Sequence, residues 1–208
     1  MSDIIDALTH ISNNNIEGCL VECGVQYGRK TMEMANTILK LEMEPRDIYM
    51  YDTFSGLTEP SSKYDWCLEN QEWKEHSDVV SYWRNQSVNN ILNRWCYASI
   101  ETVKNNMESI KNYPKERYHY IMGNILETLK EPKNIPDKIS LLRLDTDWYD
   151  STKMELEILY PKLVIGGILI IDDYYYWNGS RQATDEYFNK NKNIKLEKRY
   201  DVAYGIKY

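Results

Sequence analysis

The stretch Cys19-Leu-Val-Glu-Cys-Gly-Val-Gln-Tyr-Gly28 indicates how this chain folds. Its first five residues are typical of a short apolar strand, and the glycines that follow let the backbone turn sharply and approach a ligand closely. Residues 30–41 carry apolar side chains at helical spacing, and Asp47-Ile-Tyr-Met-Tyr-Asp52 is typical of a second strand that ends on an acid. Together these segments predict a βαβ unit with two parallel strands.

The motif Glu22-Cys-Gly24-Val-Gln-Tyr-Gly28 lies at the carboxyl end of the first strand, where open α/β proteins bind ligands. It lacks one glycine of G-x-G-x-x-G, which argues against a dinucleotide with its pyrophosphate. A ligand without phosphate fits better, although a tight turn without any ligand gives the same pattern. Asp52 lies where an acid commonly accepts hydrogen bonds from two ribose hydroxyls. The alternative for Asp52 is a cap on the turn that follows it.

Helical and extended patterns alternate along most of the remaining chain. Helices are expected at residues 1–15, 99–110, 125–130, 153–160 and 182–189, and strands at 118–122, 139–145 and 167–172. Residues 194–208 predict two short strands that form a hairpin. The alternation predicts an α/β fold with a doubly wound, mostly parallel sheet and a C-terminal antiparallel hairpin.

Residues 59–98 interrupt this alternation, because they are polar and show no regular period. The chain has 208 residues, enough for one α/β domain and too few for two. We therefore expect a single domain over residues 1–208, with residues 59–98 as a lid over a cleft. A surface insertion anchored by buried Trp side chains is an equal alternative. The segment contains Trp66, Trp73, Trp83 and Trp95.

Two acidic motifs end two further predicted strands. Asp145-Thr-Asp147 closes one strand, and Asp172-Asp173 closes the next. Adjacent parallel strands bring such carboxylates to one rim of the sheet, where like charges repel unless protons or a cation neutralise them. A hard divalent ion with oxygen ligands is the natural solution, and magnesium keeps water positions open for a substrate. Helix capping explains one such aspartate easily but four poorly.

The overall charge excludes some classes of partner. The formal net charge is −7, so we expect neither a nucleic acid nor an anionic membrane as the main partner. No signal-peptide layout opens the chain and no apolar run reaches the roughly 20 residues that cross a bilayer, which favours a cytoplasmic location. We expect reduced, largely buried thiols at Cys19, Cys23, Cys67 and Cys96, and we favour this over a metal site at Cys19 and Cys23. Surface or capping roles are expected for His10, His76 and His119.

Several segments together resemble the macrocin O-methyltransferase family, whose members methylate sugar hydroxyls with S-adenosylmethionine and magnesium. The resemblance runs from about residue 16 to about residue 190, and its acidic motifs are the most specific part. The segments are Val21-Glu-Cys-Gly-Val, Tyr51-Asp-Thr-Phe-Ser-Gly-Leu, Leu142-Arg-Leu-Asp-Thr-Asp-Trp-Tyr-Asp-Ser-Thr, Leu159-Tyr-Pro-Lys-Leu, Gly166-Gly-Ile-Leu-Ile-Ile-Asp-Asp-Tyr and Arg181-Gln-Ala. The resemblance implies a Rossmann-like class I methyltransferase fold, with which the C-terminal hairpin is compatible.

The resemblance also implies roles for individual residues. Asp145, Asp172 and Asp173 would ligate magnesium, and Asp147 matches the general base proposed for the family. S-adenosylmethionine would be bound by Glu22, Gly24, Tyr27, Gly28, Asp52, Ser55, Gly123 and Asn124. Arg181 lies in the family's R-Q-A segment, although a salt bridge to a nearby acid is at least as good an interpretation. The family suggests a homo-oligomer.

The chemistry of the residues is consistent with that reaction. A sugar hydroxyl is a very weak acid, and coordination to magnesium lowers its pKa and fixes its direction. A nearby carboxylate such as Asp147 can then accept the proton. We expect a small-molecule sugar or nucleotide-sugar acceptor, selected by residues 59–98, where the likeness to the family is slight. The alternatives are a glycosyltransferase that uses Asp145-Thr-Asp147 as D-x-D, a catechol-type phenol methyltransferase, and a binding module without activity.

Overall fold

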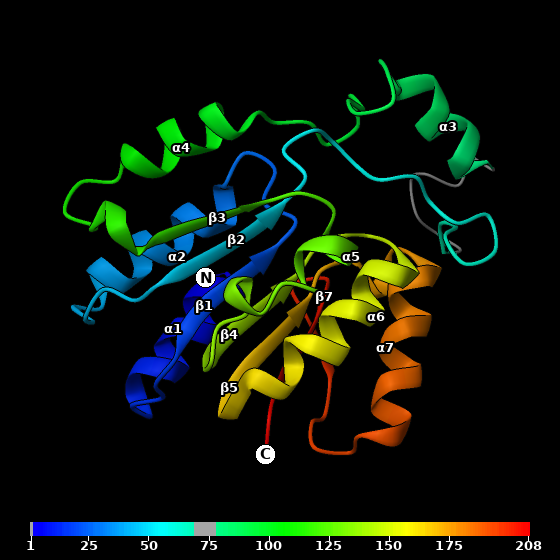
Figure 1. Ribbon diagram of the computed structural model, residues 1–208. Helices are drawn as coiled ribbons and strands as arrows, with labels where there is room; N and C mark the ends of the chain where they lie inside the picture. The colour runs from blue at the N-terminus through cyan, green and yellow to red at the C-terminus, as the bar shows by residue number, and fades with distance from the viewer. Residues whose placement is uncertain (1, 69–77) are drawn as a thin grey trace.

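The computed structural model describes residues 2–68 and 78–208, which form an α/β fold around one seven-stranded sheet (Figure 1). The strand order is β3-β2-β1-β4-β5-β7-β6. The five parallel strands are β1 (Cys19–Cys23), β2 (Ile48–Asp52), β3 (Tyr118–Met122), β4 (Ile139–Leu144) and β5 (Leu163–Ile171). The antiparallel hairpin of β6 (Glu197–Arg199) and β7 (Val202–Ile206) extends the sheet beyond β5. The predicted doubly wound, mostly parallel sheet with a C-terminal hairpin is confirmed.

Helices cover both faces of the sheet, because the buried parallel strands are apolar on both sides. One face packs against α1 (Asp3–Asn13), α2 (Arg29–Lys40) and α4 (Ile100–Glu108), through side chains such as Leu8, Met34 and Met107. The other face packs against α5 (Ile125–Thr128), α6 (Tyr149–Ile158) and α7 (Asn178–Lys190), through side chains such as Leu156 and Leu159. In Figure 1 the latter group lies on the near side of the sheet.

The register of the sheet fixes where the acidic motifs meet. Leu144 at the end of β4 pairs with Ile171 at the end of β5, so the residues that follow both strands leave the sheet side by side. The backbone N–H of Asp172 donates to the Leu144 carbonyl over 2.9 Å, and that of Asp145 donates to the Cys23 carbonyl over 2.8 Å. The carboxyl ends of β1, β4 and β5 therefore form one rim, as the topology of parallel strands requires.

Two helices begin four residues earlier than the sequence pattern predicts. We expected them at residues 153 and 182, and they begin at Tyr149 and Asn178. Neither helix has a side-chain cap from its own N-cap residue. Instead, the Tyr149 N–H donates to the carboxylate of Asp65, and the Asn178 N–H donates to the carbonyl of Trp66. These caps come from a segment more than 80 residues away, and a local pattern does not contain them.

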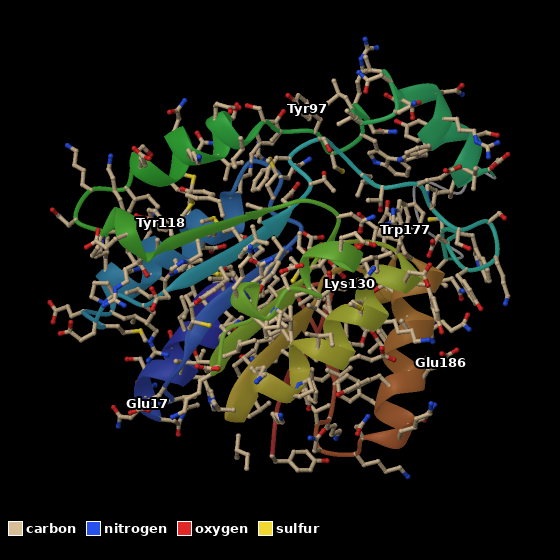
Figure 2. All side chains as sticks on the ribbon, in the orientation of Figure 1. Glu17, Tyr97, Tyr118, Lys130, Trp177 and Glu186 are labelled. Atoms are coloured by element: carbon tan, nitrogen blue, oxygen red, sulfur yellow. The ribbon has the colours of Figure 1, made fainter. Side chains whose placement is uncertain are left out.

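Part of the Trp-rich segment packs onto the carboxyl end of the sheet. Residues 57–68, which we name the cover segment, include Cys67, which forms an antiparallel bridge with Trp177. Trp177 is labelled in Figure 2. The helix α3 (Val79–Gln86) follows, and the expectation for Trp73 lies outside the described residues. Trp95, Trp148 and Trp177 pack edge to face, with ring centroids 5.2–6.1 Å apart. Trp side chains therefore anchor this region, whichever of the two interpretations of residues 59–98 holds.

The remaining sequence expectations can be placed in the fold. None of the four cysteines, all within the described ranges, forms a disulfide. His10 contacts the Gly166 carbonyl near the end of α1 and His119 contacts Asp47, whereas His76 lies outside the described residues. Arg181 forms a long, exposed ion pair with Asp185 one helical turn away, which matches its salt-bridge interpretation. Among the described helices, none is long and apolar enough to cross a membrane.

Candidate active site

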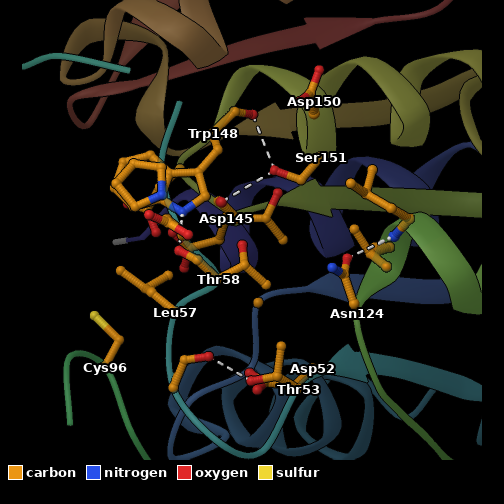
Figure 3. Close-up of a pocket in the computed structure, with 18 of the residues that line it drawn as sticks. Asp52, Thr53, Leu57, Thr58, Cys96, Asn124, Asp145, Trp148, Asp150 and Ser151 are labelled. Atoms are coloured by element: carbon orange, nitrogen blue, oxygen red, sulfur yellow. Dashed lines mark hydrogen bonds between the residues drawn. The ribbon is translucent and has the colours of Figure 1, made fainter. Parts of the chain in front are cut away.

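A pocket of about 540 Å³ opens at the carboxyl end of the sheet (Figure 3). Asp52 and Thr53 lie at one end of it and Trp148 and Asp150 at the other, with Asp145 between them. The loops after β1, β2, β3 and β4 all contribute to the lining, together with the cover segment. This is where an open α/β sheet binds its ligands.

The turn after β1 brings the backbone close to the loop after β4. Gly24 has a φ of 82°, and a Cβ at this position would lie 1.8 Å from the Asp145 carbonyl oxygen. Any side chain here would therefore force the two loops apart. Asp52 holds the same turn from the next strand, because its carboxylate accepts hydrogen bonds from the backbone N–H groups of Val25, Gln26 and Phe54 at 2.7–2.8 Å. Asp52 therefore acts as a turn cap and also lines the pocket.

Asp145, Asp172 and Asp173 come together at the rim between β4 and β5. Each offers one carboxylate oxygen, and the three oxygens lie within 4.8 Å of one another. Burial, followed by the charge of Asp145, raises the pKa of Asp172 to about 6. Burial, followed by the charges of Asp147 and Asp145, holds the pKa of Asp173 well above its usual range. Such a cluster is costly to ionise without a neighbouring cation.

Asp147 is held beside this cluster in a constrained conformation. Its φ of 66° lies in the left-handed region, which a residue other than glycine adopts only at some cost. Its backbone N–H donates to Asp173 over 2.9 Å, and the Trp177 side chain donates a hydrogen bond to its carboxylate. Burial and then the charge of Asp145 raise the pKa of Asp147 to about 8. The loop therefore positions a carboxylate that readily takes up a proton.

Arg143 lies directly behind the acidic cluster, in a role that the sequence pattern did not predict. One Nη atom lies 3.0 Å from Glu22 and 2.5 Å from Asp145, and the other lies 2.5 Å from Asp172. Only 2% of Arg143 is exposed. It therefore neutralises part of the cluster and fixes the direction of two of its carboxylates. The sequence did contain a signal for this role, because Arg143 is a charged residue inside the apolar run 141–144. An arginine buried in a strand requires acidic partners.

Asp65 is a second residue whose role the sequence pattern did not predict. It is 4% exposed, and it accepts hydrogen bonds from the N–H groups of Ser61 and Tyr149 at 2.7 and 2.8 Å. Gly179 of α7 approaches it so closely that a Cβ there would lie 1.9 Å from an Asp65 carboxylate oxygen. Asp65 therefore ties the cover segment to the first turns of α6 and α7.

The expected cofactor residues divide into two groups. Gly24, Asp52, Gly123 and Asn124 line the pocket, and Asn124 also caps α5 by accepting from the Leu126 N–H. Glu22, Tyr27, Gly28 and Ser55 do not belong to the described lining. Glu22 is 1% exposed and lies beneath the pocket, where its two oxygens accept from Arg143 and Thr31. Contact of these four residues with a cofactor stays a prediction.

The donor set suits a hard divalent cation. Three aspartates converge, each with an oxygen to offer, and all three are oxygen ligands of the type that magnesium prefers. The raised pKa values of Asp172 and Asp173 point the same way, because a cation at this position would favour their ionised forms. The residues present therefore fit a magnesium ion.

The strand order, the glycine turn after β1 and the acid at the end of β2 define the chain as a Rossmann-like class I methyltransferase fold. The sequence model of the macrocin O-methyltransferase family matches residues 1–200. The chain belongs to this family.

Curated relatives and solved structures agree with this placement. The chain is 29% identical over 189 residues to demethyldecarbamoylnovobiocin O-methyltransferase of Streptomyces niveus, covering 90% of this chain and 64% of that protein. It is 26% identical over 174 residues to 8-demethyl-8-(2,3-dimethoxy-alpha-L-rhamnosyl)-tetracenomycin-C 4'-O-methyltransferase of Streptomyces olivaceus, covering 84% and 59%. The chain thus spans about three-fifths of the length of these relatives.

Among solved structures, the O-methyltransferase NovP superposes with a TM-score of 0.77 at 25% identity, covering 99% of this chain and 78% of that one. The calicheamicin methyltransferase CalS11 superposes with a TM-score of 0.68 at 19% identity, covering 99% and 77%. The latter likeness shows the fold alone.

Proposed function

We propose that this protein is a magnesium-dependent O-methyltransferase that transfers a methyl group from S-adenosylmethionine to a sugar hydroxyl. The observation that carries the proposal is the position of the Asp145, Asp172 and Asp173 cluster beside the same pocket that Asp52 and Gly24 line. Asp145 lines that pocket, so the cofactor and the metal would lie at neighbouring positions. The choice of reaction is supported by the match to the family and by the two relatives named above, which are O-methyltransferases.

Each end of the pocket would have its own task. Asp52, Gly123 and Asn124 would bind the nucleoside part of S-adenosylmethionine, since the first ends β2 and the other two follow β3. The sequence-based roles of Glu22, Tyr27, Gly28 and Ser55 at the cofactor are retained here as part of the proposal. Asp145, Asp172 and Asp173 would hold magnesium, which when bound lowers the pKa of a coordinated hydroxyl.

Asp147 would accept the proton from the acceptor hydroxyl. Asp147 lines the pocket and its backbone N–H donates to Asp173 over 2.9 Å, but it is not one of the three convergent aspartates. S-adenosylmethionine, when bound, would supply the methyl group: the acceptor oxygen would displace the sulfur at the methyl carbon, and S-adenosylhomocysteine would leave. Because this displacement needs alignment more than covalent help, the fixed direction of Asp147 and the preformed rim are the main contributions of the chain.

The cover segment would select the acceptor. Leu57, Thr58 and Pro60 line the pocket together with Asp65, and the indole N–H of Trp148 donates to the Thr58 carbonyl over 2.9 Å. These residues belong largely to the region we expected to form a lid over a single domain. Figure 3 shows Leu57 and Thr58 across the pocket from Asn124, and an acceptor would enter on their side.

The proposal is tested by calorimetric titration with S-adenosylhomocysteine, followed by methyl transfer from radiolabelled S-adenosylmethionine to a panel of glycosides and phenols. We expect binding of S-adenosylhomocysteine with or without magnesium, and transfer to a sugar hydroxyl that stops when magnesium is chelated. Failure to bind S-adenosylhomocysteine would overturn the cofactor assignment. Transfer only to catechol-type phenols would retain the cofactor and overturn the sugar acceptor.

A further inference from the structure

The loop of residues 145–147 is supported from the face of the sheet on which Arg143 lies. Side chains alternate between the two faces along β4, so Arg143 points to the face covered by α1 and α2, and Leu142 points to the face covered by α6 and α7. The Nη atoms of Arg143 contact Asp145 and Asp172. This support ends at Asp145, so the rest of the loop depends on other contacts.

Glu155 of α6 approaches the same loop from the opposite face of the sheet. Its side chain is fully buried, with 0% exposure, and its Oε1 accepts a hydrogen bond from the Thr146 hydroxyl over 2.8 Å. Its Oε2 has no hydrogen-bond partner among the residues that the structure describes. Burying a carboxyl group costs free energy unless its oxygens are hydrogen-bonded. Stability of the fold alone therefore gives little reason for an acid at this position.

Thr146 lies between Asp145 and Asp147 in the chain, and it is bound through both its side chain and its main chain. The hydroxyl donates to Glu155, and the carbonyl accepts from the Trp148 N–H over 2.7 Å. Asp147, the next residue, has a φ of 66°, in the left-handed region. Such a conformation persists only where the surrounding contacts determine it. The bond from Glu155 to Thr146 is one of these contacts.

We propose that Glu155 is a positioning residue for methyl transfer, because its hydrogen bond with the Thr146 hydroxyl holds the 145–147 loop and so fixes the direction of the Asp147 carboxylate. This inference rests on the proposed function and adds a residue to it. The role requires an acceptor oxygen and not a negative charge. Burial holds the pKa of Glu155 well above its usual range, so the side chain is a neutral acid that an amide can replace.

The test compares four variants of the full chain. Glu155→Gln keeps an oxygen that accepts from Thr146, whereas Glu155→Leu has a similar volume and removes it. Thr146→Val removes the donor, and the double variant Thr146→Val with Glu155→Leu removes both groups. Glu157→Leu is the matched control, because Glu157 is an exposed acid on the same helix. The acceptor is the glycoside that the unmodified protein methylates fastest, with S-adenosylmethionine and magnesium saturating.

The quantity measured is kcat per site that binds S-adenosylhomocysteine, which a loss of folded protein does not change. We expect Glu155→Leu and Thr146→Val each to lower kcat by about 10–100-fold, because a misdirected carboxylate takes up the proton poorly. Glu155→Gln and Glu157→Leu should keep kcat within about threefold of the unmodified protein. The double variant should be no slower than the slower single variant, because both changes break one bond. The KM for the acceptor and the affinity for S-adenosylhomocysteine should change by less than about threefold.

Three results would overturn the inference while leaving the proposed function intact. The first is a kcat within about threefold of the unmodified protein in Glu155→Leu, or in Thr146→Val if Glu155→Leu does not fold. The second is a loss in Glu155→Gln as large as that in Glu155→Leu. The third is a double variant in which the two losses multiply, which would show that Glu155 does not act through Thr146. If the unmodified protein neither binds S-adenosylhomocysteine nor transfers a methyl group, the proposed function fails and the inference fails with it.

Discussion

Arg143 and Glu22 form a buried ion pair, 3.0 Å between Nη1 and Oε1, beneath the acidic rim. Both residues are almost fully buried, at 2% and 1% exposure. Removing Arg143 leaves Glu22 as a buried acid without its cation, whereas removing both charges is far less costly. The pair therefore supports the rim from below, since the other Arg143 contacts reach Asp145 and Asp172.

We expect Arg143→Met to lower the free energy of unfolding by about 3–5 kcal/mol, as measured by urea denaturation. The double variant Arg143→Met with Glu22→Gln removes both charges and should recover at least about half of that loss. If the double variant is no more stable than Arg143→Met alone, the pair is not the source of the effect.

Substitution of the convergent aspartates should separate metal binding from cofactor binding. We expect Asp145→Asn, Asp172→Asn and Asp173→Asn each to lower turnover by about 100-fold or more, because each removes a charged oxygen ligand. Calorimetry should show weakened magnesium binding and S-adenosylhomocysteine affinity within about threefold of the unmodified protein. Full activity in all three variants would contradict the metal site.

Asp52 should produce the opposite pattern. It accepts three backbone hydrogen bonds that hold the turn after β1, and it lines the cofactor end of the pocket. Asp52→Asn loses the charge and part of this acceptor capacity, so we expect S-adenosylhomocysteine to bind about 10–100-fold more weakly. Magnesium binding serves as the control and should be retained. Equal loss of both ligands would indicate general unfolding instead of a local role.

Asp65 predicts a pH dependence of stability. Burial raises its pKa from 3.8 to about 6, so the folded state retains this proton at pH values where the unfolded state has released it. The contribution of Asp65 to stability is therefore greatest below pH 4 and falls as the pH rises from about 4 to about 6, by about 3 kcal/mol in total.

The measurement is the difference in unfolding free energy between the unmodified protein and Asp65→Asn at several pH values. Because asparagine does not titrate, we expect the difference to shift in favour of Asp65→Asn by about 3 kcal/mol between pH 4 and pH 7. A difference that stays constant across this range would show that Asp65 titrates normally.

Much of the fold and of the site could be predicted, because the local sequence pattern and the order of the strands lead to the same arrangement. The apolar strands end on acids, and the parallel order alone brings Asp145 and Asp172 to one rim. What could not be predicted depends on contacts between distant segments. The helix begins early, at Tyr149, because Asp65 caps it from 84 residues away in the sequence. No residue next to Tyr149 in the sequence predicts this cap. Glu22 was expected at the pocket wall, but its direction depends on Arg143, which only the folded sheet brings alongside.

The anchoring of the cover segment has a practical consequence for anyone who wishes to redirect this enzyme to other acceptors. Exchanging residues 57–68 for those of a relative would exchange the cap of α6, and with it the start of the helix that directly follows Asp147. A graft that lacks an acid at position 65 should therefore disturb the reaction centre as well as the acceptor wall. Because Gly179 leaves room for that acid, the acid and the glycine should be transplanted together as one unit.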